Sequence, residues 1–99
     1  MSWRAKIDRS LERFILQEQK EPTEIMLTKI LANPVAVEQN INVKDLKEYN
    51  NLLVSVHEFI FLPVDEEGNE LEVIVDKDLS FNNELIELFS GYSISIYIK

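Results

Sequence analysis

The sequence predicts a single α+β domain over residues 1–99, in which an N-terminal amphipathic helix and one to three short helices pack on an antiparallel sheet of about four strands. Three observations lead to this prediction. The length of 99 residues suits one hydrophobic core and little more. One long segment has apolar residues at helical spacing, whereas several shorter segments alternate as strands do. The helical and strand-like segments do not follow one another as βαβ units, which favours α+β over α/β.

Residues 2–20 are predicted to form the N-terminal helix. Ser2 is a suitable cap for its start, because a serine hydroxyl can accept a hydrogen bond from the first helical turn. The apolar side chains that would form one stripe are Trp3, Ile7, Leu11, Phe14 and Ile15. Pro22 ends the helix, since a proline disfavours the helical conformation of the residue before it. Residues 23–28 then follow as a short strand.

Two short helices are expected in the next segment, around residues 34–39 and 43–50. Asn33 and Pro34 are residue types preferred at the cap and at the first position of a helix, so the first of the two would begin there. A proline also interrupts any longer helix that includes it.

Residues 52–76 are predicted to form a central β-hairpin. The stretch "LLVSVHEFIFLPV" changes from alternating to continuous apolar residues, as expected where both faces of a strand are covered. The turn "DEEGN" contains Gly68, which tolerates a positive φ angle, and "ELEVIVD" alternates as a returning strand does.

The last part of the chain is predicted to contain one short helix and one strand. The stretch "SFNNELIELFSG" suits a helix that Gly91 closes. Residues 92–98 form the C-terminal strand, with Tyr92, Ile94, Ile96 and Ile98 on one side. If this strand lies at a sheet edge, its unpaired backbone groups can pair with another chain.

Composition excludes several classes of protein. Without cysteine there is no disulfide, no thiolate zinc site and no thiol nucleophile. Glycine occurs only at positions 68 and 91, so a phosphate-binding loop of the usual kind is absent. The sequence has no apolar run long enough to span a membrane and no secretory signal, which predicts a soluble, cytoplasmic protein with no membrane partner.

The net charge of -8 is carried entirely by the second part of the chain. Residues 1–57 contain eight basic and eight acidic side chains, whereas residues 58–99 contain ten acids and two lysines. Such a surface repels nucleic acid phosphates and anionic lipid, and it attracts basic surfaces over a Debye length of about 8 Å. Direct binding of nucleic acid is therefore not expected.

The acidic side chains of the hairpin are the first candidate site. A calcium loop of the EF-hand type has glycine at its sixth position and glutamate at its twelfth, but "DEEGNELEVIVD" has glycine at the fourth and aspartate at the twelfth. Nothing indicates that the carboxylates of this hairpin, or Glu84 and Glu87 after it, are buried as acid–base catalysis requires. We therefore expect no metal, no cofactor and no catalytic residue among them.

His57 is the only histidine and the last candidate for catalysis. A nucleophilic triad needs a serine or cysteine and an acid placed around such a histidine, and no motif in the sequence supplies them. A histidine on a strand face with one hydrogen bond is the simpler interpretation. A small hydrolase that uses His57 remains the least favoured of three hypotheses.

The favoured hypothesis is a non-enzymatic, acidic protein-binding module, an adaptor or inhibitor that engages a basic surface, for example that of a nucleic-acid-binding protein. Its binding residues would be Asp65, Glu66, Glu67, Glu70, Glu72, Asp76 and Asp78. The order of a helix, the "PTEIMLT" strand, a hairpin and the closing "SISIYIK" strand resembles small proteins of phages and mobile elements.

The alternative hypothesis is a structural subunit that forms a homo-oligomer through the C-terminal strand or the N-terminal helix. The side chains predicted to take part are Trp3, Ile7, Tyr92, Ile94, Ile96 and Ile98. Because apolar burial and strand pairing would drive this assembly, it should depend little on salt.

Overall fold

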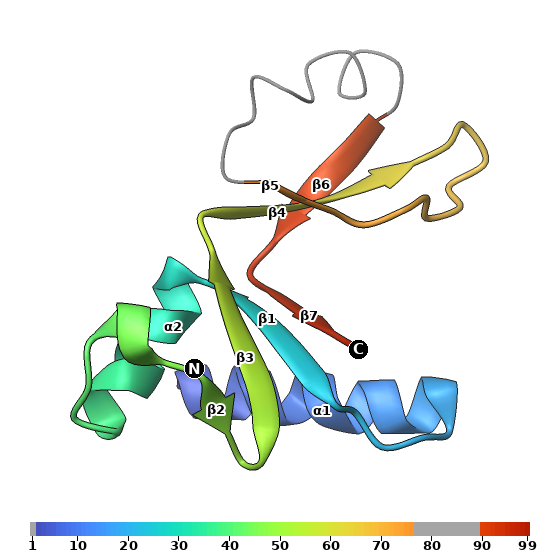
Figure 1. Cartoon of the computed structure of the whole chain (residues 1–99). Coiled ribbons are helices and arrows are strands. Elements are labelled where there is room, and N and C mark those ends of the chain that lie inside the picture. The colour runs from blue at the N-terminus through green and yellow to red at the C-terminus, as the bar shows by residue number, and fades with distance from the viewer. Residues whose placement is uncertain (1, 77–89) are drawn as a thin grey trace.

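A computed structural model of the chain describes residues 2–76 and 90–99 (Figure 1). These residues form two helices and seven strands, and the strands make two sheets. In chain order the elements are α1 (Trp3–Glu18), β1 (Glu24–Thr28), α2 (Lys29–Glu38), the 3₁₀ turn η1 (Val43–Asp45), β2 (Glu48–Tyr49), β3 (Leu52–His57), β4 (Phe59–Val64), β5 (Ile74–Asp76), β6 (Ser90–Ile94) and β7 (Ile96–Ile98). The predicted α+β class is confirmed.

Helix α1 begins and ends where its local sequence allows. The Ser2 hydroxyl accepts a hydrogen bond from the Ala5 N–H at 3.1 Å, as a helix cap does. At the other end Gln19 adopts the left-handed conformation, with φ 55°, and its N–H donates to the Ile15 carbonyl at 2.9 Å. The predicted helix over residues 2–20 is thus confirmed to within two residues at its end.

The larger sheet, sheet A, has the strand order β2-β3-β1-β7 and is mixed. Strand β1 pairs antiparallel with β7 but parallel with β3. The parallel pair arises because α2 and η1 lie between β1 and β3 and return the chain to the end of the sheet where β1 starts. The expectation of a wholly antiparallel sheet therefore does not hold for this one pair.

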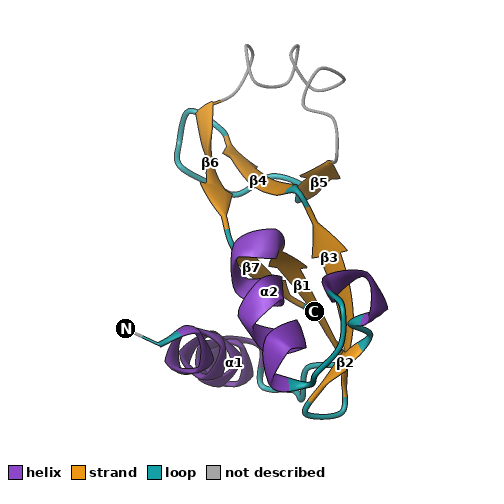
Figure 2. Cartoon of the chain, turned by 90° about the vertical axis from the view of Figure 1, so that its left-hand side faces the viewer, coloured by secondary structure: helices purple, strands orange, loops and turns teal. Residues whose placement is uncertain are grey.

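Both helices pack on the same face of sheet A and form the core with it. In Figure 2, α2 stands in front of the sheet and α1 is seen nearly end-on. Ile7 of α1 and Val35 of α2 are almost completely buried against alternate residues of the strands, among them Ile25 and Leu27. The core also includes Leu31, Ala32, Ala36, Leu46, Tyr49, Leu52, Val54 and Ile98.

The smaller sheet, sheet B, has the order β5-β4-β6. Strands β4 and β6 extend the two strands that flank β1, and β5 pairs with β4. Strand β4 continues β3 after a break at Glu58, and β7 continues β6 after a break at Ser95. Strand β1 ends at Thr28, whose N–H donates to the Ser95 carbonyl at 3.0 Å. Beyond Thr28 the two extensions, β4 and β6, pair directly with each other.

The region between β1 and β3 differs from its prediction. Helix α2 starts at Lys29, five residues before the predicted start at Pro34, so the proline lies inside the helix. The predicted helix over residues 43–50 is wrong: η1 covers three residues and β2 pairs with β3. The turn between β2 and β3 has Asn50 and Asn51 at positive φ angles of 47° and 66°, which is the chemistry of a tight hairpin turn.

The hairpin predicted over residues 52–76 is present only in part, as strands β4 and β5, because its first predicted strand is divided at Glu58 and β3 belongs to sheet A. The pairing of β4 with the returning segment also shifts its register by one residue. Phe61 pairs with Ile74, but Val64 bridges Glu70, so the returning segment contains one extra residue between the two pairs. Such a bulge changes the face to which the following side chains point.

The last predicted helix falls mainly on residues 77–89, outside the residues that the structure describes. Gly91, predicted to close that helix, lies within β6 opposite Pro63. A Cβ atom at Gly91 would approach the Phe61 ring to 2.2 Å, which explains why glycine occupies this position.

Candidate functional site

The turn of the acidic hairpin is organised by Asp65. One oxygen of its carboxylate accepts hydrogen bonds from the N–H groups of Glu67 at 3.0 Å and Asn69 at 2.8 Å, and its carbonyl accepts from the Gly68 N–H at 3.0 Å. The backbone N–H of Asn69 is the main cause of a lowered pKa for Asp65. This carboxylate, predicted to bind a partner, therefore holds its own turn together.

Glu70 is also engaged within the chain. Its carboxylate accepts a hydrogen bond from the Tyr92 hydroxyl at 2.7 Å, which joins the returning arm of the hairpin to β6. This hydrogen bond raises the pKa of Tyr92, because ionising the phenol would place two negative charges side by side.

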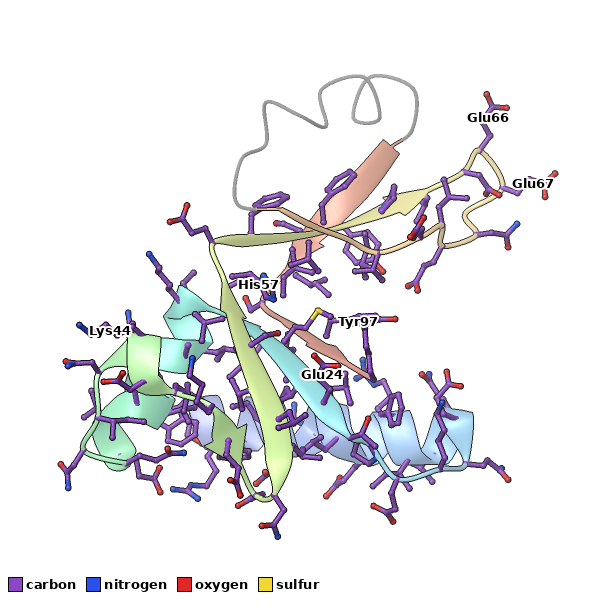
Figure 3. All side chains as sticks on the ribbon, viewed as in Figure 1. Glu24, Lys44, His57, Glu66, Glu67 and Tyr97 are labelled. Atoms are coloured by element: carbon purple, nitrogen blue, oxygen red, sulfur yellow. The ribbon has the colours of Figure 1, made fainter. Side chains whose placement is uncertain are left out.

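The remaining acids do not gather into one patch. Glu66 and Glu67 are exposed and project from the tip of the hairpin, away from both sheets (Figure 3). Glu72 is also exposed, but it lines a groove of about 560 Å³ with Met26 and Tyr97, whereas Glu70 lines a different groove beside α1. The register shift between Val64 and Ile74 accounts for this separation of two residues that a regular strand would place on one face. The Asp76 side chain and Asp78 lie outside what the structure describes.

No metal site is formed by the part of the chain that the structure describes. Within residues 2–76 and 90–99, no group of three or more histidine and acidic side chains could hold an ion. Asp65 and Glu67 come close to a shared partner, but that partner is the side-chain amide of Asn69, at 3.3 and 3.5 Å.

His57 lies at the end of β3, half-buried and in register with Thr28. Its Nε2 atom is 2.9 Å from the Ser55 hydroxyl, a partner that the sequence alone does not identify. Residues two apart on a strand point to the same face, so strand geometry is sufficient to explain the contact. Hydrolysis with Ser55 as nucleophile and His57 as base would require, in addition, a group that orients the histidine and donors that stabilise an oxyanion.

The C-terminal strands lie at the outer edge of both sheets. Among the described residues, β7 is outermost in sheet A and β6 is outermost in sheet B, so residues 90–98 form one long edge, which we call the β6–β7 edge. A groove of about 520 Å³ follows this edge from Tyr92 to Ile98, and the opposite wall is helix α1. Helix α1 contributes Lys6, Ser10, Arg13, Phe14 and Gln17 to this wall.

The side chains predicted to mediate self-association divide into two groups. Ile7 is completely buried and Ile98 is 9% exposed, while Trp3 and Ile96 pack against the same core, so these side chains stabilise the single chain. Tyr92, which is 45% exposed, and Ile94, which is half-buried, both line the groove. Of the predicted set, Tyr92 is exposed and Ile94 is not part of the main core cluster.

The closing strand is evident from the sequence, but the groove beside it is not. The wall of the groove brings α1 next to β6 and β7, which are more than seventy residues away in the sequence. Helical spacing separates the apolar from the polar side of α1, but it does not reveal which element lies beside the polar side.

A comparison of the chain with protein-family models, with curated proteins and with solved structures finds no match. Among the described residues, no helix has the length and apolar character needed to cross a membrane.

Proposed function

We propose that this chain is a non-enzymatic protein-binding module and that the β6–β7 edge is its binding surface. The proposal depends chiefly on one observation: a single chain segment forms the outermost strand of both sheets and is bordered by a groove along most of its length. An outermost strand presents backbone N–H and C=O groups that have no partner in its own sheet, and an added strand can bind them.

The groove suits an extended polypeptide better than a small molecule. Its floor is a strand, and its walls combine apolar contacts from Phe14 and Tyr92 with the charged groups of Lys6 and Arg13. Added strands gain affinity from main-chain hydrogen bonds and specificity from side-chain pockets of this mixed kind. The proposal retains the cytoplasmic location expected from the sequence.

Photo-crosslinking in the cells that produce the protein tests the proposal. Benzoylphenylalanine replaces Ser93, which is exposed on the edge, and in a matched control it replaces Lys44, which is exposed on η1. We expect discrete protein adducts at position 93 and none at position 44. A lack of adducts at position 93, or the same adducts at both positions, would show that the edge is not a binding surface.

A second candidate function is the acidic adaptor or inhibitor of a basic partner. The exposure of Glu66 and Glu67 at the hairpin tip favours it, because charges that project into solvent can approach another surface without desolvating a buried group. With Asp65 and Glu70 engaged in hydrogen bonds within the chain, the acidic surface proposed here is smaller than the seven residues predicted.

An oligolysine peptide is a suitable probe for this second function. The double variant Glu66→Gln with Glu67→Gln should bind it more weakly than a control in which Glu18 and Glu21, also exposed, are both changed to Gln. Since both variants lose the same charge, fluorescence anisotropy at low salt separates a local site from the attraction of the net charge. Equal affinities of the two variants would exclude a site at the tip.

A further inference from the structure

The geometry points to a second copy of this chain as the molecule that occupies the β6–β7 edge. The two copies would pair antiparallel about a two-fold axis that passes between Ile94 and Ser95 of each. This inference rests on the proposed function, because it assigns a partner to the same edge. It follows from which backbone groups of the edge are already paired and which point outward.

In β7, the odd-numbered residues face the neighbouring strand. The Lys99 N–H donates to the Glu24 carbonyl at 2.9 Å, the Glu24 N–H donates to the Lys99 carbonyl at 3.2 Å, and the Thr28 N–H donates to the Ser95 carbonyl. Backbone groups alternate in direction along a strand. The groups of Ile96 and Ile98 therefore point to the open edge.

In β6 the alternation is reversed, so that the odd-numbered residues face the open edge. The Pro63 carbonyl accepts from the Leu71 N–H at 2.9 Å, so the backbone groups of Pro63 face the returning arm of the hairpin and not β6. Gly91, which is opposite Pro63, consequently has its backbone groups directed away from β4. Ser93 shares this direction, and Tyr92 and Ile94 face β4.

The alternation changes phase between Ile94 and Ser95, because the backbone groups of Ile94 face β4 and the Ser95 carbonyl faces Thr28 of β1. The outward residues are Gly91, Ser93, Ile96 and Ile98. This set is symmetric about the midpoint between residues 94 and 95. When two copies pair antiparallel about that point, Gly91 lies opposite Ile98 and Ser93 lies opposite Ile96, so every outward residue meets an outward residue.

This symmetry distinguishes a second copy from an unrelated strand. A regular strand alternates without a change of phase, so it can follow β6 or β7 but not both. A second copy has the same irregularity at the same distance from the axis and therefore follows the whole edge. The edge thus specifies both its partner and the register of pairing.

The charges beside the edge favour the same antiparallel direction. At one end of the edge, Tyr92 lies beside Glu70 and the acidic hairpin, and along the groove α1 contributes Lys6 and Arg13. Antiparallel pairing turns the acidic end of each copy toward the β7 end of the other, where α1 lies. A parallel arrangement would bring the two acidic ends together, at an electrostatic cost.

The mass of the protein in solution gives the first test. By light scattering after size exclusion, the wild-type chain should show twice 11.6 kDa at high concentration, largely independent of salt. Ser93→Pro removes an outward N–H without removing a bond to β4, and should give the monomer mass. Ser93→Ala, which keeps the N–H, should remain a dimer. A wild-type monomer up to the millimolar range would overturn the inference.

Disulfide formation tests the register and does not depend on the proline variant being folded. In the inferred pairing the two Ser95 residues lie one residue apart across the axis, with Cα atoms about 6 Å apart, which is within disulfide range. Under mild oxidation Ser95→Cys should give a linked dimer much faster than Lys44→Cys, the collision control. Equal rates for the two variants would rule out this register.

The outcomes separate the inference from the proposed function. A monomer that still gives adducts with another protein at position 93 overturns self-pairing and supports the binding module. A monomer without such adducts overturns both. Ile96→Lys is not a suitable variant here, because Ile96 packs against the core and its replacement would destabilise the single chain as well as the pairing.

Discussion

Individual residues of the acidic hairpin show that charge in a sequence does not reveal how a carboxylate is used. Asp65 and Glu66 are adjacent acids of similar chemistry, yet the first accepts two backbone hydrogen bonds and the second is exposed at the tip. The difference comes from the turn. Aspartate has the short side chain that can reach the N–H groups two and four residues ahead.

The stability of the protein should depend on Asp65 at neutral pH more than at low pH. The pKa of Asp65 in the folded chain is lower than the ordinary value of 3.8, so its contribution is complete above that value and is lost as the pH falls through the lowered pKa. In urea unfolding, Asp65→Ala should therefore destabilise at neutral pH and less at about pH 3. Glu66→Ala is the control, and a loss for Asp65→Ala that does not change with pH would contradict the argument.

Tyr92 should titrate above the ordinary value of 10.0. Glu70→Gln removes the negative charge next to the phenol, so the pKa of Tyr92 should fall toward 10.0, as measured by the ultraviolet absorbance of tyrosinate. Because the folded pKa is raised, the hydrogen bond stabilises the fold below pH 10 and is lost as the pH rises through that pKa. The Tyr92→Phe variant shows which part of the absorbance change belongs to Tyr92. An unchanged pKa of Tyr92 in Glu70→Gln would exclude the hydrogen bond in solution.

Gly91→Ala should destabilise the protein by about 1–3 kcal/mol, the usual cost of overpacking. The added Cβ would lie 2.2 Å from Cζ of Phe61 and 2.9 Å from the Leu62 carbonyl oxygen, so both the ring and the backbone oppose it. In a Phe61→Leu background the cost should be smaller, because one of the two clashes is relieved. The same cost in both backgrounds, measured by chemical unfolding, would contradict this packing.

At the scale of elements, helix α2 shows how tertiary burial outweighs a local signal. A proline inside a helix removes a hydrogen bond and strains the preceding turn. Leu31 and Ala32 before Pro34, and Val35 and Ala36 after it, are buried in the core. Their burial stabilises a continuous helix despite the proline.

Pro34→Ala should raise the free energy of unfolding by about 1–3 kcal/mol, because alanine restores the backbone N–H and relieves the strain. Chemical unfolding measures the change, and Asn33→Ala, an exposed position in the same helix, is the control. A lower stability of the Pro34→Ala variant would show that the proline ring contributes more by packing than it costs in the helix.

Elements with strong local patterns were predicted well, and those that depend on contacts were not. The stripe and cap of α1 and the alternation of residues 92–98 are properties of neighbouring residues. The Asn50–Asn51 turn also has a local signal, because asparagine tolerates positive φ angles, but the prediction of a helix over residues 43–50 did not include it. The breaks at Glu58 and Ser95 had none, since they occur where β1 ends between the two flanking strands.

At the scale of the whole molecule, the net charge of -8 should weaken the fold at low salt. Like charges repel one another in the compact state, and added salt screens this repulsion. The melting temperature should therefore rise between low and physiological salt. The variant with Glu66→Gln and Glu67→Gln should be less sensitive to salt, and a melting temperature that falls with salt would contradict the argument.

The sequence by itself determined the fold class, the first helix, the hairpin and the separation of charge, because each depends on residues that are close along the chain. Only the tertiary structure decided that the closing strand is the edge of both sheets, that α1 forms a groove beside it, and that the acids point in different directions. These features depend on strand order and register, which are set by contacts between residues far apart in the chain.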